Sequence, residues 1–251
     1  MTEINLPKRF DAENTNLGCW LKVPSSITAE IAARSGFDYI CADMQHGFID
    51  RSDLLPMLQA IQPHTKQVLV RVPSNEASTI GWALDAGATG VIVPLVNSAS
   101  QAAEAIRSCQ YPPKGIRSMG PTRATRVFGE SYVDGVKESI QCLPMIETSE
   151  ALENLDDILS VDGVNAIYVG PSDLSVNLGL PKGNNDGERE FDKALETIIK
   201  SCEIHNVVPG IHTNSSLAEL REKQGFKILT VAEDDVAMQT EIRRVLAQLK
   251  P

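Results

Sequence analysis

The feature that most limits the possible folds is the regular alternation of eight short apolar runs with amphipathic segments along the 251 residues. Runs that are apolar throughout are typical of parallel strands buried on both faces, because helices cover one face and the core fills the other. The intervening segments repeat apolar residues at helical spacing. We predict strands over residues 17–23, 39–42, 68–72, 90–93, 142–146, 166–169, 207–211 and 228–231, and helices over 28–34, 52–61, 76–84, 98–108, 190–203, 216–224 and 234–249.

This repeat of strand and helix favours a closed barrel, since such barrels commonly contain about 250 residues. An open doubly wound sheet is the alternative. It has less support, because no Gly-x-Gly-x-x-Gly motif follows the first strand and the chain has no Walker-type loop. We therefore predict that residues 1–251 form one α/β domain, a (β/α)8 TIM barrel.

The charge balance excludes several kinds of partner. The chain has 23 Lys and Arg against 33 Asp and Glu, a formal charge of −10, so its surface repels nucleic acids and anionic membranes. No apolar stretch reaches the roughly 20 residues of a membrane helix, and residues 1–11 contain no apolar signal region. We expect a cytoplasmic protein. Its five cysteines include no Cys-x-x-Cys pair and are expected to pack as free thiols.

Polar residues follow the predicted strands. In a barrel, catalytic groups project from the carboxyl ends of the strands, so these residues are expected to converge on one rim. They comprise Trp20 and Lys22, residues 43–47, Arg71, Glu147, residues 170–173, His212, Glu233 and Asp234.

Glu147 and Asp173 form the most informative pair on this rim. Two carboxylates from neighbouring strands suit a hard divalent ion such as Mg²⁺ or Mn²⁺ that keeps open positions for substrate oxygens. The alternative is that each carboxylate caps the helix that follows its strand.

His46 and Arg71 add a potential base and a cation to the same rim. Taken singly, a histidine is more often structural and an arginine more often a solvated charge. Together with the carboxylates, they define a site where an oxyanion could be formed and stabilised.

Several motifs occur in an order that resembles one known family. They cover residues 18–21, 36–38, 43–47, 70–73, 84–90, 111–117, 145–148 and 170–175. The resemblance is to the HpcH/HpaI aldolase and citrate lyase family, which includes 2,4-dihydroxyhept-2-ene-1,7-dioate aldolase. These metal-dependent enzymes of the phosphoenolpyruvate/pyruvate superfamily split 4-hydroxy-2-keto acids into pyruvate and an aldehyde.

The resemblance implies roles for the rim residues. Glu147 and Asp173 would bind Mg²⁺, Mn²⁺ or Co²⁺, His46 would act as the base, and Arg71 would steady the pyruvate enolate. The expected function is that of a carbon–carbon lyase, a class II pyruvate aldolase, with a role in aromatic compound catabolism. A Schiff base on lysine is less favoured, because Lys22 is the only lysine candidate on the rim.

The resemblance also implies part of the substrate site, and the sequence itself offers further candidates. The backbone of Gly170 and Ser172 would cradle the pyruvate carboxylate, and Trp20 is expected in the pocket. Arg117 is predicted to contact an anionic aldehyde, with simple surface charge as the alternative. Gln45 stands where the family commonly has Glu, so a charge near the metal is lost and metal affinity or preference is expected to differ.

Asp85 presents a conflict of position. It matches the family's partner for the catalytic histidine, yet it precedes the fourth strand and so lies at the opposite end of its own barrel. A neighbouring subunit would have to supply it, or its role is structural.

The last helix, 234–249, carries more apolar residues than one narrow stripe needs. We expect a homo-oligomer, a hexamer by family resemblance, with this helix exchanged between barrels. The alternative is that the helix closes its own barrel.

Two other functions remain open at this point. One is an oxaloacetate decarboxylase or another carbon–carbon lyase of the same superfamily, which needs the same enolate site. The other is a barrel that binds a keto acid without turnover and serves as a scaffold.

Overall fold

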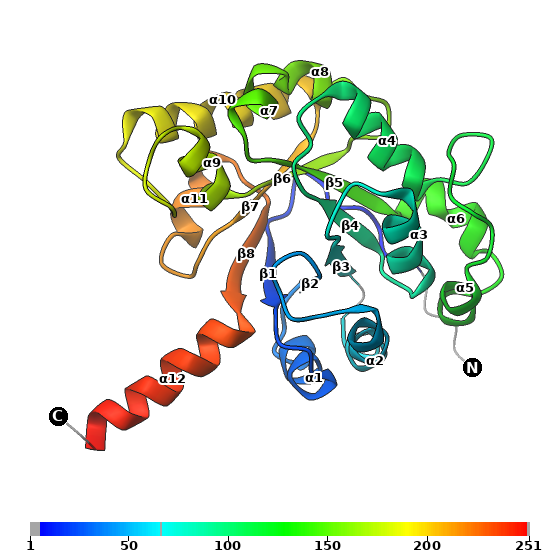
Figure 1. Cartoon of the computed structure of the whole chain (residues 1–251), viewed down its shortest axis with the longest axis horizontal. Coiled ribbons are helices and arrows are strands. Elements are labelled where there is room, and N and C mark those ends of the chain that lie inside the picture. Colours follow the sequence, from blue (N-terminus) through cyan, green and yellow to red (C-terminus); the bar gives the residue numbers. More distant parts are fainter. Residues whose placement is uncertain (1–5, 66, 250–251) are drawn as a thin grey trace.

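The computed structural model describes residues 6–65 and 67–249, and its centre is a closed barrel of eight parallel strands (Figure 1). Each strand pairs with the strands before and after it in the chain, and β8 closes the ring on β1. This confirms the predicted barrel and excludes the open sheet. The strands are β1 (Asn16–Leu21), β2 (Tyr39–Asp43), β3 (Gln67–Arg71), β4 (Gly90–Val93), β5 (Gln141–Ile146), β6 (Ala166–Val169), β7 (Val208–His212) and β8 (Ile228–Glu233).

Helices surround the barrel, and local sequence sets where several of them begin. Asp50 caps α2 and forms a reciprocal capping box with Asp53, while Ser25, Ser98 and Thr148 cap α1, α4 and α7. The helices are α1 (Ser26–Arg34), α2 (Arg51–Ile61), α3 (Ala77–Asp85), α4 (Ala99–Cys109), α5 (Thr122–Phe128), α6 (Tyr132–Ser139), α7 (Ser149–Glu153), α8 (Leu155–Leu159), α9 (Pro171–Asn177), α10 (Arg189–His205), α11 (Ala218–Gln224) and α12 (Asp234–Leu249).

Strand alternation decides which side chains enter the barrel. On β2, Ile40 and Ala42 pack in the layer between strands and helices, whereas Tyr39 and Cys41 belong to the cluster inside the barrel. Continuing this period of two places Asp43 inside as well, at the end of the strand. The interior is therefore apolar and aromatic in its lower layers and polar at the carboxyl rim.

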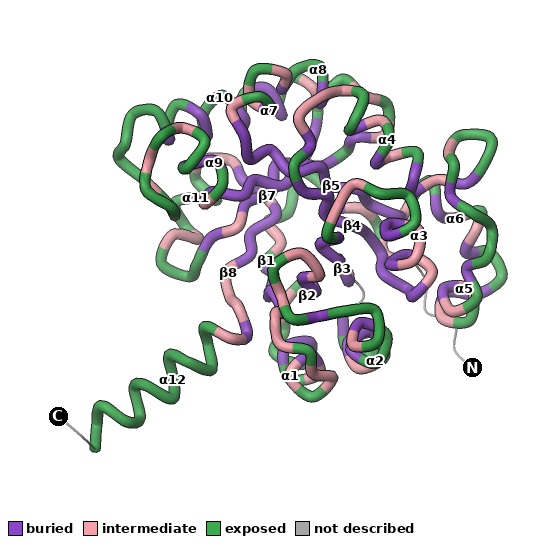
Figure 2. The backbone as a smooth tube through the Cα atoms, in the orientation of Figure 1, coloured by how far each residue is buried: buried purple, intermediate pink, exposed green. Residues whose placement is uncertain are grey.

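The last helix, α12, extends away from the barrel instead of packing on it (Figure 1). Among its residues only Asp234 is buried, and its carboxylate accepts hydrogen bonds from the backbone amides of Lys22 and Val23. The rest of the helix is open to solvent (Figure 2). The alternative in which it closes its own barrel is wrong.

Two smaller expectations can be compared with the described residues. No helix among them is both long and apolar enough to cross a membrane. All five cysteines are buried free thiols, as predicted.

Candidate active site

Many of the predicted rim residues, although not Glu147 or Asp234, line a cavity of about 520 Å³ at the carboxyl ends of the strands. Trp20, His46, Arg71, Gly170, Ser172 and Asp173 line it, as predicted, together with Lys22, Tyr168, His212 and Glu233.

Asp43 organises one side of this cavity. Its fully buried carboxylate accepts hydrogen bonds from Arg71 Nε at 2.9 Å and from Trp20 Nε1 at 3.1 Å. It also accepts hydrogen bonds from the backbone amides of Gln45 and His46. Burial alone would raise the pKa of Asp43, but the guanidinium and the other donors outweigh it and hold the pKa below its usual value.

Arg71 is consequently fixed in position as a buried cation. Asp43 binds it through two nitrogens, and its guanidinium lies 5.0 Å from the centre of the Trp20 ring. Sequence reasoning assigned no role to Asp43. A usable signal existed, because Asp43 ends its strand directly beside Arg71 in the sheet register.

Glu147 lies beyond the end of β5 and is 2% exposed. Its Oε1 accepts a hydrogen bond from the backbone amide of Leu95 at 2.8 Å. Burial raises the pKa of Glu147 to about 7, and the negative charge of Asp173 acts in the same direction. The positive charge of Arg71 and the hydrogen bond from Leu95 lower the pKa of Glu147 but do not offset these effects.

Gly170 is required beside this carboxylate. A Cβ atom at this position would lie 2.4 Å from Glu147 Oε2, closer than such atoms approach. The absence of a side chain at Gly170, which lines the cavity, thus lets the Glu147 carboxylate lie directly behind it.

The capping alternative for the two carboxylates is wrong. Thr148, not Glu147, caps α7, and α9 has no side-chain cap although Asp173 lies in its first turn. The two carboxylates suit a hard divalent cation. Within the described chain, no cluster of three or more His, Cys, Asp or Glu side chains is arranged to hold a metal ion.

His46 and Gln45 differ in their relation to the cavity. The His46 side chain is exposed and lines the cavity, while its backbone is held by Asp43. Gln45 does not line the cavity, although sequence reasoning placed it among the substrate-binding residues. Its side-chain oxygen is buried and has no hydrogen-bond partner within the described chain.

Asp85 and Arg117 lie together, away from this cavity. Arg117 Nη2 is 2.6 Å from Asp85 Oδ1 and 3.0 Å from Tyr132 Oη, and its guanidinium lies 4.7 Å from the centre of the Tyr111 ring. The structure therefore contradicts contact between Arg117 and an aldehyde in its own barrel. Simple surface charge is wrong too, because Arg117 is buried. Asp85 ends α3, at the opposite end of the barrel from His46, as its sequence position indicated.

Three polar residues at the ends of β1, β7 and β8 also form a cluster that was not predicted from the sequence. His212 Nε2 lies 3.3 Å from Glu233 Oε1, and the Lys22 ammonium pairs with the other oxygen of the same carboxylate. Hydrogen bonding from His212, supported by Lys22, lowers the pKa of Glu233 to about 2. All three residues line the cavity.

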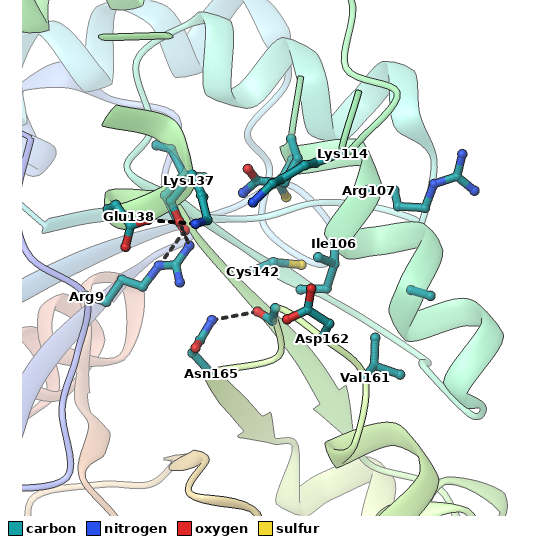
Figure 3. A pocket seen from close by; sticks show the side chains of 15 residues that line it. Arg9, Ile106, Arg107, Lys114, Lys137, Glu138, Cys142, Val161, Asp162 and Asn165 are labelled. Carbon is teal, nitrogen blue, oxygen red and sulfur yellow. Dashed lines mark hydrogen bonds and ion pairs between the residues drawn. The ribbon is translucent and has the colours of Figure 1, made fainter. Parts of the chain in front are cut away.

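A second cavity of about 470 Å³ lies near the amino ends of β5 and β6 (Figure 3). Four cationic residues line it: Arg9, Arg107, Lys114 and Lys137. Arg9 donates to backbone carbonyls, and Lys137 pairs with Glu138 at 3.3 Å. None of the predicted site residues lines it.

A closed parallel barrel with acidic, basic and cationic groups on its carboxyl rim defines a class of barrel enzymes that stabilise an oxyanion in a polar pocket. The chain belongs to the HpcH/HpaI aldolase/citrate lyase family, whose model matches residues 16–238. It is thus an aldolase, a carbon–carbon lyase, as the sequence predicted.

Three comparisons illustrate the relationship. The chain is 36% identical to a hydroxypyruvate/pyruvate aldolase of Rhizorhabdus wittichii, over 93% of this chain and 94% of the relative. A family member of known structure from Burkholderia cenocepacia is 26% identical, with a TM-score of 0.87 and 95% of each chain covered. A citrate lyase beta subunit from M. tuberculosis, complexed with oxaloacetate and magnesium, shares the fold at 15% identity and a TM-score of 0.58, covering 90% of this chain and 95% of that one.

Proposed function

We propose that this chain cleaves 4-hydroxy-2-keto acids into pyruvate and an aldehyde, and catalyses the reverse addition, with a divalent metal ion. The observation that carries this proposal is that the buried Glu147 lies against Gly170, which lines one cavity together with Asp173 and the buried cation Arg71. Such a pocket suits a substrate that bears a carboxylate and a keto group and that develops negative charge on oxygen.

Glu147 and Asp173 would hold the ion. A bound cation favours the ionised form of Glu147, whose pKa of about 7 leaves it partly protonated at neutral pH without one. When bound, a divalent ion supplies Lewis acidity toward the keto and carboxylate oxygens of the substrate. The magnesium in the M. tuberculosis relative supports the choice of ion.

Arg71 would donate hydrogen bonds to the keto oxygen as it gains enolate charge. Its guanidinium is already oriented by Asp43, so little reorganisation is needed during the reaction. The backbone of Gly170 and Ser172 would receive the substrate carboxylate, because Gly170 has no side chain to obstruct its approach.

His46 would remove the proton of the C4 hydroxyl. The C4–O bond then becomes a carbonyl, the C3–C4 bond breaks, and its electron pair forms the C2–C3 double bond of pyruvate enolate. Protonation of C3 yields pyruvate. His46 suits this role because its side chain is exposed in the pocket while its backbone is fixed.

The test is release of pyruvate from a panel of 4-hydroxy-2-keto acids before and after exhaustive chelation. We expect cleavage to stop on chelation and to return with Mg²⁺, Mn²⁺ or Co²⁺. Full activity after chelation, or a pyruvate adduct trapped on a lysine by borohydride, would contradict the proposal. No turnover of any substrate would favour the keto-acid-binding scaffold.

We also propose that the chain forms a homo-oligomer, a hexamer by family resemblance, in which α12 packs on a neighbouring barrel. Six apolar side chains of this helix are at least 43% exposed, which is unfavourable for a helix in water. A neighbouring subunit could then also bring Asp85 near His46. The cytoplasmic location and the role in aromatic compound catabolism stay predictions.

A further inference from the structure

Three adjacent strands of the barrel end in a polar cluster that the proposed reaction does not use. We call it the Lys22 cluster; it consists of Lys22 after β1, His212 at the end of β7 and Glu233 at the end of β8. Arg71 belongs to β3, and Glu147 follows β5. The Lys22 cluster therefore forms a separate sector of the cavity wall.

The imidazole of His212 is held from several sides. Its Nε2 lies 3.3 Å from Glu233, its Nδ1 lies 3.4 Å from Tyr168 Oη, and its ring packs edge-on against Trp20 with 5.0 Å between centroids. Trp20 in turn stacks on Tyr168 at 5.6 Å. These contacts fix the direction in which the ring presents its edge to the cavity.

The charges of the Lys22 cluster balance each other. The Lys22 ammonium pairs with Glu233 and lies 3.9 Å from Asp235, so two carboxylates face one lysine. His212 adds a positive charge only when it is protonated. Within the cluster, the lysine already faces two carboxylates, which disfavours the binding of a second anionic group of the substrate there.

The same balance suits a neutral hydroxyl group. A hydroxyl can donate to Glu233 and accept from Lys22 or His212, and the cluster presents both kinds of partner at one place. The side chains of these three residues are 21–26% exposed, so they are partly desolvated and still open to a ligand. Hydrogen bonds to charged partners in such a setting are stronger than those between neutral groups.

We propose that the Lys22 cluster binds an alcohol hydroxyl of the substrate and makes this aldolase selective for hydroxylated substrates. The inference rests on the proposed function, since it names a substrate class for the same pocket. The hydroxyl has two possible sources: the carbon next to the aldehyde carbonyl, or C3 of the keto acid donor.

The test compares substrates that differ only by a methyl in place of the hydroxyl. With pyruvate as donor, glycolaldehyde is compared with propanal. With one fixed aldehyde, hydroxypyruvate is compared with 2-oxobutanoate. We expect a preference of about tenfold or more in kcat/KM for the hydroxylated member of at least one pair. The pair that shows the preference identifies the source of the hydroxyl.

Variants connect the preference to the cluster. In Lys22→Met and His212→Phe, we expect the ratio of kcat/KM within the discriminating pair to fall to about twofold or less. The matched control is Lys223→Met, which breaks an equivalent lysine–glutamate pair with Glu219 on the exposed surface. Because each ratio is measured on one preparation, partial loss of folded protein does not change it.

Two outcomes overturn the inference. One is wild-type protein that uses both members of each pair equally, and the other is a preference that survives in both cluster variants. A further experiment separates failure of this inference from failure of the proposed function. It follows by NMR the exchange of the C3 protons of pyruvate for deuterium, which needs no aldehyde. Exchange without a hydroxyl preference overturns only this inference, whereas absence of both exchange and cleavage overturns the proposed function as well.

Discussion

At the scale of single residues, the site depends on how each charge is paired. Arg71 is buried and neutralised by Asp43, so it stays in place without substrate. Glu147 is buried without such a partner, which raises its pKa to about 7. One carboxylate therefore orients a cation of the protein, and we propose that the other binds a cation from solution.

The first residue-level prediction concerns the proposed base and the enolate-binding cation. His46→Ala and Arg71→Ala should each lower kcat by about 10²-fold or more, because one removes proton transfer and the other removes a preorganised positive charge. Steady-state kinetics would measure this. His205→Ala, which alters a half-buried histidine that is paired with Asp156 and does not line the cavity, is the control and should keep normal turnover. Near wild-type turnover in either site variant would exclude that residue from the mechanism.

The second concerns Glu233. Its pKa of about 2 in the folded protein lies below the ordinary 4.5. The pairing with His212 and Lys22 thus stabilises the folded state above about pH 4.5, and this contribution is lost as the pH falls toward 2. In ¹³C NMR titrations, we expect the carboxylate to remain ionised at pH 3.5. In His212→Phe its midpoint should rise. A wild-type midpoint near 4.5 would contradict the pairing.

At the scale of elements, the junction of β6 with α9 joins fold and chemistry. The strand delivers Gly170 beside Glu147, and the following turn delivers Ser172 and Asp173 to the same cavity. A side chain at Gly170 would collide with Glu147 Oε2. The junction therefore holds both proposed metal ligands at a spacing that depends on one glycine.

We predict that Gly170→Ala weakens metal binding while the barrel still folds. The added Cβ must displace Glu147, so Mn²⁺ affinity measured by calorimetry should fall by about tenfold or more. Gly120→Ala is the matched control, because nothing lies within 4 Å of the position of its Cβ. Unchanged affinity in the Gly170 variant would show that Glu147 does not bind the ion.

At the scale of the whole molecule, the strands and the surrounding helices bury a common core, but α12 does not pack on the barrel. The other helices cover the barrel, whereas α12 exposes an apolar face (Figure 2). Burial of such a face in a partner contributes about 25 cal/mol for each Å² of apolar area removed from water. This exposed face supports the proposal that the chain assembles with further copies of itself.

We predict that polar substitution of this face dissociates the protein. The double variant Ile242→Ser, Leu246→Ser should form a smaller species than the wild type in light scattering, because the apolar contact area is lost. Ile204→Ser changes an isolated residue of α10 that is 78% exposed, and it should leave the mass unchanged. A wild-type protein that is monomeric and fully active at micromolar concentration would refute the assembly.

The amino-acid sequence was sufficient to predict the barrel, the family and most rim residues. Uniform apolar runs and residues that follow them, such as Arg71 and Glu147, are local features, and the barrel's symmetry brings strand ends together in a predictable way. The family motifs added the aldolase function.

Pairing between side chains required three-dimensional structure. The sequence does not say that Asp43 binds Arg71, that Arg117 is buried against Tyr111, or that His212 and Lys22 share Glu233. These contacts join residues distant in the chain, and they depend on strand register and side-chain direction, which apolar periodicity does not encode. The position of α12 also required the structure. The apolar residues of a helix indicate a face that favours burial, but they do not indicate which surface covers it.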